Sequence, residues 1–158
     1  MIGRAFLATV LALAAVAMSC SSKSARNYGN DLFGTNEVPP VTTNAAGNVS
    51  FTLSSDETSM SFVLTITEPI DSAFASHIHL GAPGVNGDVV VPLWTGEQGM
   101  GYTGTLRSAT LTNADLTGPM AGKTLAALAE SIDAGHVYVN VHTKAHPAGE
   151  IRGQLQQE

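Results

Sequence analysis

Cysteine, basic residues and aromatic residues are all scarce in this chain of 158 residues. The single cysteine, Cys20, has no partner for an intrachain disulfide, and a zinc site built from several cysteines is excluded. Only 7 residues are Lys or Arg, against 13 Asp or Glu, and they form no basic cluster. Because nucleic-acid binding relies on clustered basic side chains, we expect no nucleic-acid partner. With aromatics at 6%, the core must rest on Val, Leu, Ile and Ala.

Long apolar runs are also missing. A membrane-spanning helix needs about 20 apolar residues, whereas the run over residues 5–18 has 14 and follows Arg4. A short apolar run after a positive residue is typical of a secretory signal. The run ends in Ala17-Met18-Ser19-Cys20, which resembles the lipobox of bacterial lipoproteins. This resemblance implies cleavage before Cys20 and lipidation of that cysteine; the alternative is a plain signal peptide with a chance cysteine.

These features predict three segments. Residues 1–19 form a lipoprotein signal peptide, the polar residues 20–30 a flexible tether, and residues 31–158 one folded domain. The lipid on Cys20 would attach the domain to a membrane outside the cytoplasm. Ser21 follows the cysteine, where an inner-membrane retention signal would resemble Asp, so in a Gram-negative cell we expect the outer membrane.

Alternation of apolar and polar residues predicts about seven short strands. They cover residues 49–53, 60–66, 77–80, 89–94, 102–106, 137–142 and 150–155. Residues 89–94 are apolar on both faces, so we expect a central strand there. One helix is predicted where Leu125, Leu128, Ala129 and Ile132 follow a helical spacing, with Gly135 at its end. The pattern predicts an all-β fold: an antiparallel Greek-key or immunoglobulin-like sandwich with one crossover helix.

Three histidines lie in phase on two of these strands. His77 and His79 are two residues apart, so they share one face of a strand. His142 lies opposite the apolar residues of another strand. If the apolar residues face the core, all three histidines face the polar side and could converge on one copper or zinc ion. Tyr138, Asn140, Glu150 and Arg152 have the same phase and are candidates for supporting or structural roles, with Glu150 also a candidate fourth ligand.

A structural network is the alternative to a metal site. In it the histidines would bind backbone carbonyls, and Glu150 would pair with Arg152 or cap loop amides. We expect His136 at the far end of its strand and His146 in a solvated loop. The sequence has no nucleophile elbow, phosphate loop or dinucleotide fingerprint, so it identifies no catalytic residue.

Four motifs resemble the CHRD domain, the module named for chordin. They are Leu32 to Pro40, the His77-Ile-His-Leu-Gly81 segment with Asn86-Gly87, Tyr138 to Thr143, and Pro147 to Gln154, in the family's order. The resemblance implies an extracytoplasmic β-sandwich module without an agreed activity. It leads us to expect a non-enzymatic, lipid-anchored binding module with an unknown envelope or extracellular partner.

The chain is also similar, more distantly, to copper/zinc superoxide dismutase, a Greek-key sandwich with an H-x-H pair at its copper site. That likeness implies copper-ligand roles for His77, His79 and His142. The dismutase disulfide cysteines and an evident zinc loop are missing here. Two alternatives to a binding module therefore stay open: a copper redox enzyme, and a purely structural or adhesive module of the envelope.

Overall fold

The computed structural model describes residues 23–158. The predicted signal peptide and Cys20 lie outside the described residues. The strands are β1 (Arg26–Phe33), β2 (Ala46–Leu53), β3 (Met60–Ile70), β4 (Ala73–Leu80), β5 (Asp88–Thr95), β6 (Tyr102–Leu111), β7 (Val137–Thr143), β8 (Ile151–Gln154) and β9 (Gln156–Gln157). The α-helix of this part of the chain is α1 (Leu125–Asp133), and three single-turn 3₁₀ helices lie at Gly34–Asn36, Asn113–Asp115 and Gly118–Met120.

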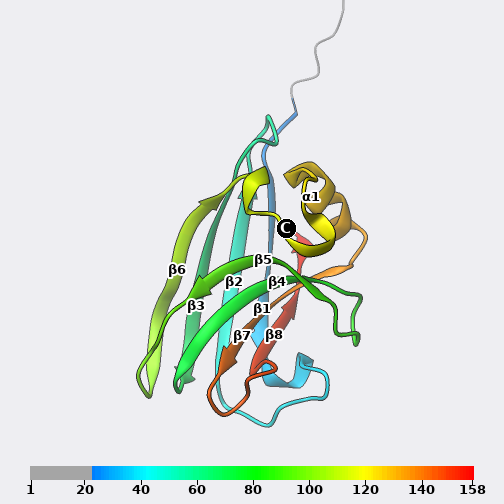
Figure 1. Cartoon of the computed structure of the whole chain (residues 1–158). Coiled ribbons are helices and arrows are strands. Elements are labelled where there is room, and N and C mark those ends of the chain that lie inside the picture. The colour runs from blue at the N-terminus through cyan, green and yellow to red at the C-terminus, as the bar shows by residue number, and fades with distance from the viewer. Residues whose placement is uncertain (1–22) are drawn as a thin grey trace, which may run out of the picture.

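All paired strands are antiparallel, which confirms the predicted fold class. The strand order is β5-β4-β7-β8-β1-β2-β3-β6, with β9 paired to β1. In Figure 1 the half of the sheet with β4 and β5 lies in front of the half with β2, β3 and β6. The sheet thus folds over on itself, and its apolar residues form one buried core.

Alternation works as predicted in β2 and β3. Val49, Phe51 and Leu53 are buried while the residues between them are exposed. Phe51 stacks on Phe62 of β3, with ring centroids 5.6 Å apart. These cross-strand contacts fix the register, because a slip of one residue would turn the apolar side chains towards solvent.

The predicted helix is confirmed as the crossover between β6 and β7 (Figure 1). It begins after Thr124, whose hydroxyl accepts a hydrogen bond from the Ala127 amide. The four residues whose spacing predicted it, Leu125, Leu128, Ala129 and Ile132, are all buried. Gly135 has a φ of 75° just beyond the helix, where a left-handed residue is favoured.

Two predictions about the order of the chain need correction. Residues 26–30, predicted as tether, belong to β1, where Tyr28 is fully buried and every residue pairs with β2. The strand at 89–94 is not central: β5 ends the sheet order. Its edge is covered instead by the segment after β6, since the Thr117 amide donates a hydrogen bond to the Val90 carbonyl oxygen at 2.8 Å.

The β4-β7-β8 half of the sheet is buried on both faces. Its inner face carries apolar residues such as Ile78 and Val139. On the outer face the register places His77 beside Asn140 and Asn140 beside Arg152. Loops cover this outer face, so that Arg152 is only 1% exposed. The fold therefore has a second, polar interior beneath its loops. Within residues 23–158 no helix is long and apolar enough to cross a membrane.

Candidate functional site

The three predicted histidines converge. His77 and His79 extend from β4 and His142 from the neighbouring strand β7. The ring centroids of His77 and His142 are 4.8 Å apart, and the other two pairs are 5.7 and 6.1 Å apart. One nitrogen of each ring lies within 4.8 Å of the others. The expectation that histidines from two distant segments meet on one wall of the sandwich is confirmed.

Backbone carbonyls determine where the ring protons lie. His79 Nδ1 is 2.9 Å from the Gly87 carbonyl oxygen, and His142 Nδ1 is 3.0 Å from that of Pro147. Because a carbonyl oxygen only accepts, both Nδ1 atoms carry the proton. In the neutral rings both Nε2 atoms then carry a lone pair instead of a proton, which is the form that binds a metal. His77 Nδ1 lies 2.9 Å from His142 Nε2 and donates its proton to it.

The separations suit a chelated ion after small ring movements. Ligands at about 2.0–2.1 Å in tetrahedral geometry have nitrogens about 3.3 Å apart. The 2.9 Å between His77 and His142 is slightly shorter than this, and the 4.8 Å limit of the group is wider. An ion bound between these two rings would take the place of the proton on His77 Nδ1, which would move to Nε2 of the same ring, and the His79 ring would have to move closer.

Burial keeps these histidines neutral. It lowers the pKa of His77 to about 4, with the neighbouring His142 and His79 acting in the same direction. Burial also lowers the pKa of His79 and of His142, although the Gly87 and Pro147 carbonyls favour the charged form of each ring. No proton has to leave an imidazolium when an ion binds at neutral pH.

Tyr138 packs against the His79 ring, and Arg152 packs against the Tyr138 ring. The Tyr138 ring stacks on the His79 ring, with centroids 4.7 Å apart and planes 4° apart. The Arg152 guanidinium lies 3.4 Å from the centre of the Tyr138 ring. The Gly87 peptide holds both rings, because its amide donates to the Tyr138 hydroxyl and its carbonyl oxygen accepts from His79.

Glu150 is engaged elsewhere. Its two carboxylate oxygens accept hydrogen bonds from the hydroxyls of Thr43 and Thr143, at 2.7 and 2.6 Å. The geometry thus gives it a structural role between β7 and the loop before β2, rather than that of fourth ligand.

Arg152 does not pair with Glu150 either. It donates to Asn86 Oδ1 and to the carbonyl oxygens of Ala82 and Val85, which ties the loop after β4 to the sheet. Its charge is satisfied by these oxygens and by the ring of Tyr138, as a buried charge requires. His136 and His146 are outside the histidine group.

Glu37 was not anticipated from the sequence. It is 5% exposed and lies with Arg152 in a cleft of about 540 Å³ between the loop after β1 and the loop after β4. Its pKa is raised to about 7 by burial, against the opposing effects of Arg152 and the Asn140 amide. Only the fold brings it to the histidine strands, which lie about 40 and about 100 residues further along the sequence, so no local pattern could have found it.

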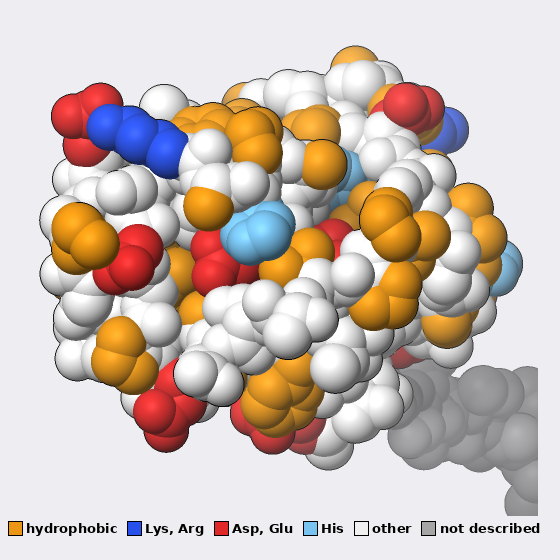
Figure 2. Space-filling view, turned by 90° about the horizontal axis from the view of Figure 1, so that it is seen from below, with side chains coloured by type: hydrophobic (Ala, Val, Ile, Leu, Met, Phe, Trp, Pro, Cys, Tyr) orange, Lys and Arg blue, Asp and Glu red, His pale blue; other side chains and the backbone are white. Residues whose placement is uncertain are grey.

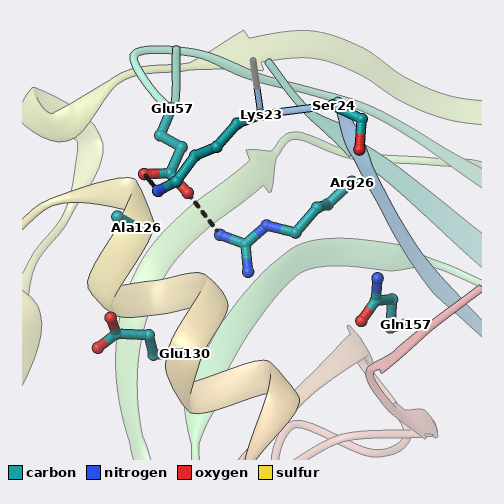
Figure 3. Close-up of a pocket in the computed structure, with 7 residues that line it drawn as sticks. All are labelled: Lys23, Ser24, Arg26, Glu57, Ala126, Glu130 and Gln157. Carbon is teal, nitrogen blue, oxygen red and sulfur yellow. Dashed lines mark hydrogen bonds and ion pairs between the residues drawn. The ribbon is translucent and has the colours of Figure 1, made fainter. Parts of the chain in front are cut away.

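A second pocket, of about 500 Å³, lies far from the histidines in sequence and is drawn in Figure 3. Lys23 and Arg26 both bind the Glu57 carboxylate at 2.9 Å, and Arg26 also binds Asp133 at 3.0 Å. Exposed ion pairs of this kind contribute little stability. They attach the first described residues to the hairpin after β2 and to α1.

The comparisons with known proteins identify the family. The CHRD domain model matches residues 28–155, most of the described chain. The chain belongs to the CHRD domain family. The match begins three residues before the predicted domain boundary, in agreement with the buried part of β1. The comparisons with curated proteins and with solved structures gave no match.

The CHRD motifs therefore surround the histidine site. The match covers both histidine strands and the loops that hold them. Figure 2 looks onto the end of the molecule that is lowest in Figure 1, and histidine side chains are visible there among acidic and apolar ones. Since His77 is only partly buried, an ion held by the three rings would be accessible from one side.

Proposed function

We propose that this CHRD domain is a binding module that holds one copper ion, with zinc as the competing ion, through His77, His79 and His142. The observation that carries the proposal is the convergence of three neutral imidazoles, two of which have Nδ1 fixed by a carbonyl. Metal-ligating histidines characteristically donate their second ring nitrogen in this way.

The donor set favours these ions. Imidazole suits copper and zinc, whereas calcium and magnesium require oxygen ligands. Along the first transition series a nitrogen site binds Cu²⁺ more tightly than Zn²⁺. The three rings leave at least one coordination position for water or a partner's side chain, since no carboxylate belongs to the group in the described chain.

Metal analysis and titration of the untagged protein test the proposal. We expect about one equivalent of copper, lost in a His77→Ala/His79→Ala variant and retained in a His136→Ala/His146→Ala control. The control removes two histidines outside the group and leaves its rings intact. If neither copper nor zinc binds more tightly than about 10 μM at pH 7.5, corresponding to about −7 kcal/mol, the histidines are a structural network.

A copper redox enzyme is separated from a binding module by one assay. The copper-loaded protein is compared with free copper and with the double-histidine variant for superoxide turnover. We expect background turnover, as for a module that stores or presents the ion. Turnover that depends on the histidines would favour the enzyme.

We further propose that the domain is attached to the cell envelope by lipid on Cys20, outside the cytoplasm. The support is the sequence alone: a short apolar run that ends in small residues just before the cysteine. Metabolic labelling with a fatty acid should mark the wild-type protein but not a Cys20→Ala variant. In cell fractionation the variant should no longer be found with the membranes. Labelling that persists in the variant would refute this assignment.

A further inference from the structure

Four buried polar side-chain atoms in residues 23–158 have no hydrogen-bond partner. They are Tyr28 Oη, Glu37 Oε1, His79 Nε2 and Asn140 Oδ1. Unpaired buried groups are uncommon and costly, so each one asks for a physical explanation. Three of these four belong to one group beside the histidine site.

Glu37, Asn140 and His79 form a continuous chain of polar groups. Glu37 Oε1 and Asn140 Nδ2 both approach Gly149 so closely that a Cβ there would overlap them. On its other side the Asn140 amide lies close enough to His79 to influence the pKa of that ring, although the facing atoms, Asn140 Oδ1 and His79 Nε2, are not hydrogen-bonded as they stand. Asn140 therefore lies between the carboxyl group of Glu37 and the imidazole of His79.

All three unpaired atoms are acceptors as they stand. The amide oxygen of Asn140 accepts only, and so does an ionised Glu37. His79 Nε2 carries a lone pair because the proton of that ring is on Nδ1, facing Gly87. Neither the amide oxygen nor the imidazole lone pair facing it can donate to the other.

Two small changes satisfy all three atoms together. A 180° rotation of the Asn140 amide, whose oxygen and nitrogen are nearly equivalent in shape, directs its NH₂ group to His79 Nε2. The amide oxygen then faces Glu37. One proton on Glu37 makes the carboxyl group a donor to that oxygen.

We propose that Asn140 is a positioning residue which donates a hydrogen bond to His79 Nε2 in the metal-free protein, while Glu37 is a neutral carboxylic acid that donates to the Asn140 oxygen. The consequence for metal binding rests on the proposed function; the hydrogen bonds themselves do not. Asn140 would keep the His79 lone pair occupied until an ion displaces it.

The surroundings of Glu37 agree with a neutral acid. Burial dominates there and raises the pKa to about 7. The charged group that faces it is Arg152, which favours the ionised form but already has three oxygens and an aromatic ring as partners. No ion pair between Glu37 and Arg152 occurs among the ion pairs of the described chain.

Nuclear magnetic resonance of the metal-free, isotope-labelled protein at pH 6 tests the arrangement directly. We expect a nitrogen–nitrogen coupling through the hydrogen bond from Asn140 Nδ2 to His79 Nε2. It should persist in Glu37→Gln, whose amide can also donate to the Asn140 oxygen, and weaken in Glu37→Leu, which has no donor. The Glu37 carboxyl carbon should titrate near 7. Absence of the coupling in the wild type, or a titration near the ordinary value of 4.5, would overturn the proposal.

Copper affinity supplies the second readout. Removing a competing hydrogen bond in Asn140→Ala should tighten binding about two- to tenfold, with exposed Asn48→Ala as the unchanged control. Loss of affinity in Asn140→Ala would instead make Asn140 a ligand and overturn its role as a competitor. If the coupling is present but copper does not bind to the wild type, the proposed function fails and the hydrogen-bond arrangement stands.

Discussion

The three histidines on the outer face of the sheet and Glu37 in the loop after β1 are titratable side chains in the polar interior beneath the loops. Burial disfavours the charged form of each, so it raises the pKa of the acid and lowers the pKa of the bases. Near neutral pH the histidines are therefore uncharged and Glu37 is close to its midpoint. The buried positive charge in this polar interior is that of Arg152, which is held by oxygens and by Tyr138.

Replacing Glu37 by Gln should stabilise the protein at high pH. The pKa of Glu37 rises from 4.5 to about 7 on folding, so the folded state binds the proton more tightly. The resulting stabilisation is complete below pH 4.5 and is lost as the pH rises through 7. Gln cannot ionise, so at pH 8 Glu37→Gln should be more stable by about 2–3 kcal/mol, with little difference at pH 5. Denaturant unfolding at both pH values measures this, and exposed Glu68→Gln is the control; an equal effect at both values would contradict it.

The residues of the site differ in how far the sequence could predict them. His77, His79 and His142 lie in alternating strands, where the phase alone indicates which face each side chain takes. Glu37 and Gly87 lie in irregular segments, where phase has no meaning. Their positions depend on how two loops fold over the sheet, and no periodic pattern of apolar and polar residues predicts the path of a loop.

The loop after β4 is the element that determines the histidine geometry. Its Gly87 peptide binds both His79 and Tyr138, and its Asn86 side chain reaches the Val38 carbonyl oxygen of the facing loop at 2.7 Å. Within this loop Gly87 passes so close to Leu80 that a Cβ would overlap the Leu80 carbonyl oxygen. The contact of this loop with the histidines depends on the three-dimensional fold and not on any local sequence pattern.

A Gly87→Ala substitution should therefore damage the site through its backbone. The added methyl group would displace the loop and break the hydrogen bonds to His79 and Tyr138. We expect a loss of about 1–3 kcal/mol in unfolding free energy and copper binding at least about tenfold weaker. Gly99→Ala is the matched control, because a Cβ there meets nothing within 4 Å. Equal copper affinities in the two variants would show that the loop does not determine the site.

Strand predictions succeeded where one face is buried and the other is exposed. β2 and β3 have this character, and alternation found them. β1 reads Arg-Asn-Tyr-Gly-Asn-Asp-Leu-Phe, in which buried Gly29 interrupts the alternation, and for this reason the sequence pattern predicts a tether up to residue 30 instead of a strand. β5 looked central because it is apolar on both faces. It lies at an edge that a later segment covers, and such cover cannot be seen in the strand's own sequence.

The whole molecule combines an apolar core with a polar interior on the other side of the same sheet. The two depend differently on pH, because the core has no ionisable group of the kind that fills the polar interior. Acid should therefore act on the protein mainly through the histidine face. Burial there lowers the pKa values of the three histidines and raises that of Glu37.

The metal-free protein should lose stability as the pH falls below 6.5, the ordinary pKa of histidine. Below this pH the histidines of the unfolded chain are protonated, whereas those of the folded protein stay neutral. His77 stays neutral in the folded protein down to a pH of about 4. Each histidine that stays neutral lowers the unfolding free energy by up to about 1.4 kcal/mol per pH unit. Glu37 acts in the opposite direction, but it is one group against three.

Denaturant unfolding between pH 7.5 and 4.5 measures this slope. In His77→Ala/His79→Ala two of the three groups are absent, so its stability should depend much less on pH. The His136→Ala/His146→Ala control should keep the wild-type slope, because those histidines lie outside the group. If the double-histidine variant and the wild type lost stability in parallel, the buried histidines would not be the acid-sensitive part of the fold.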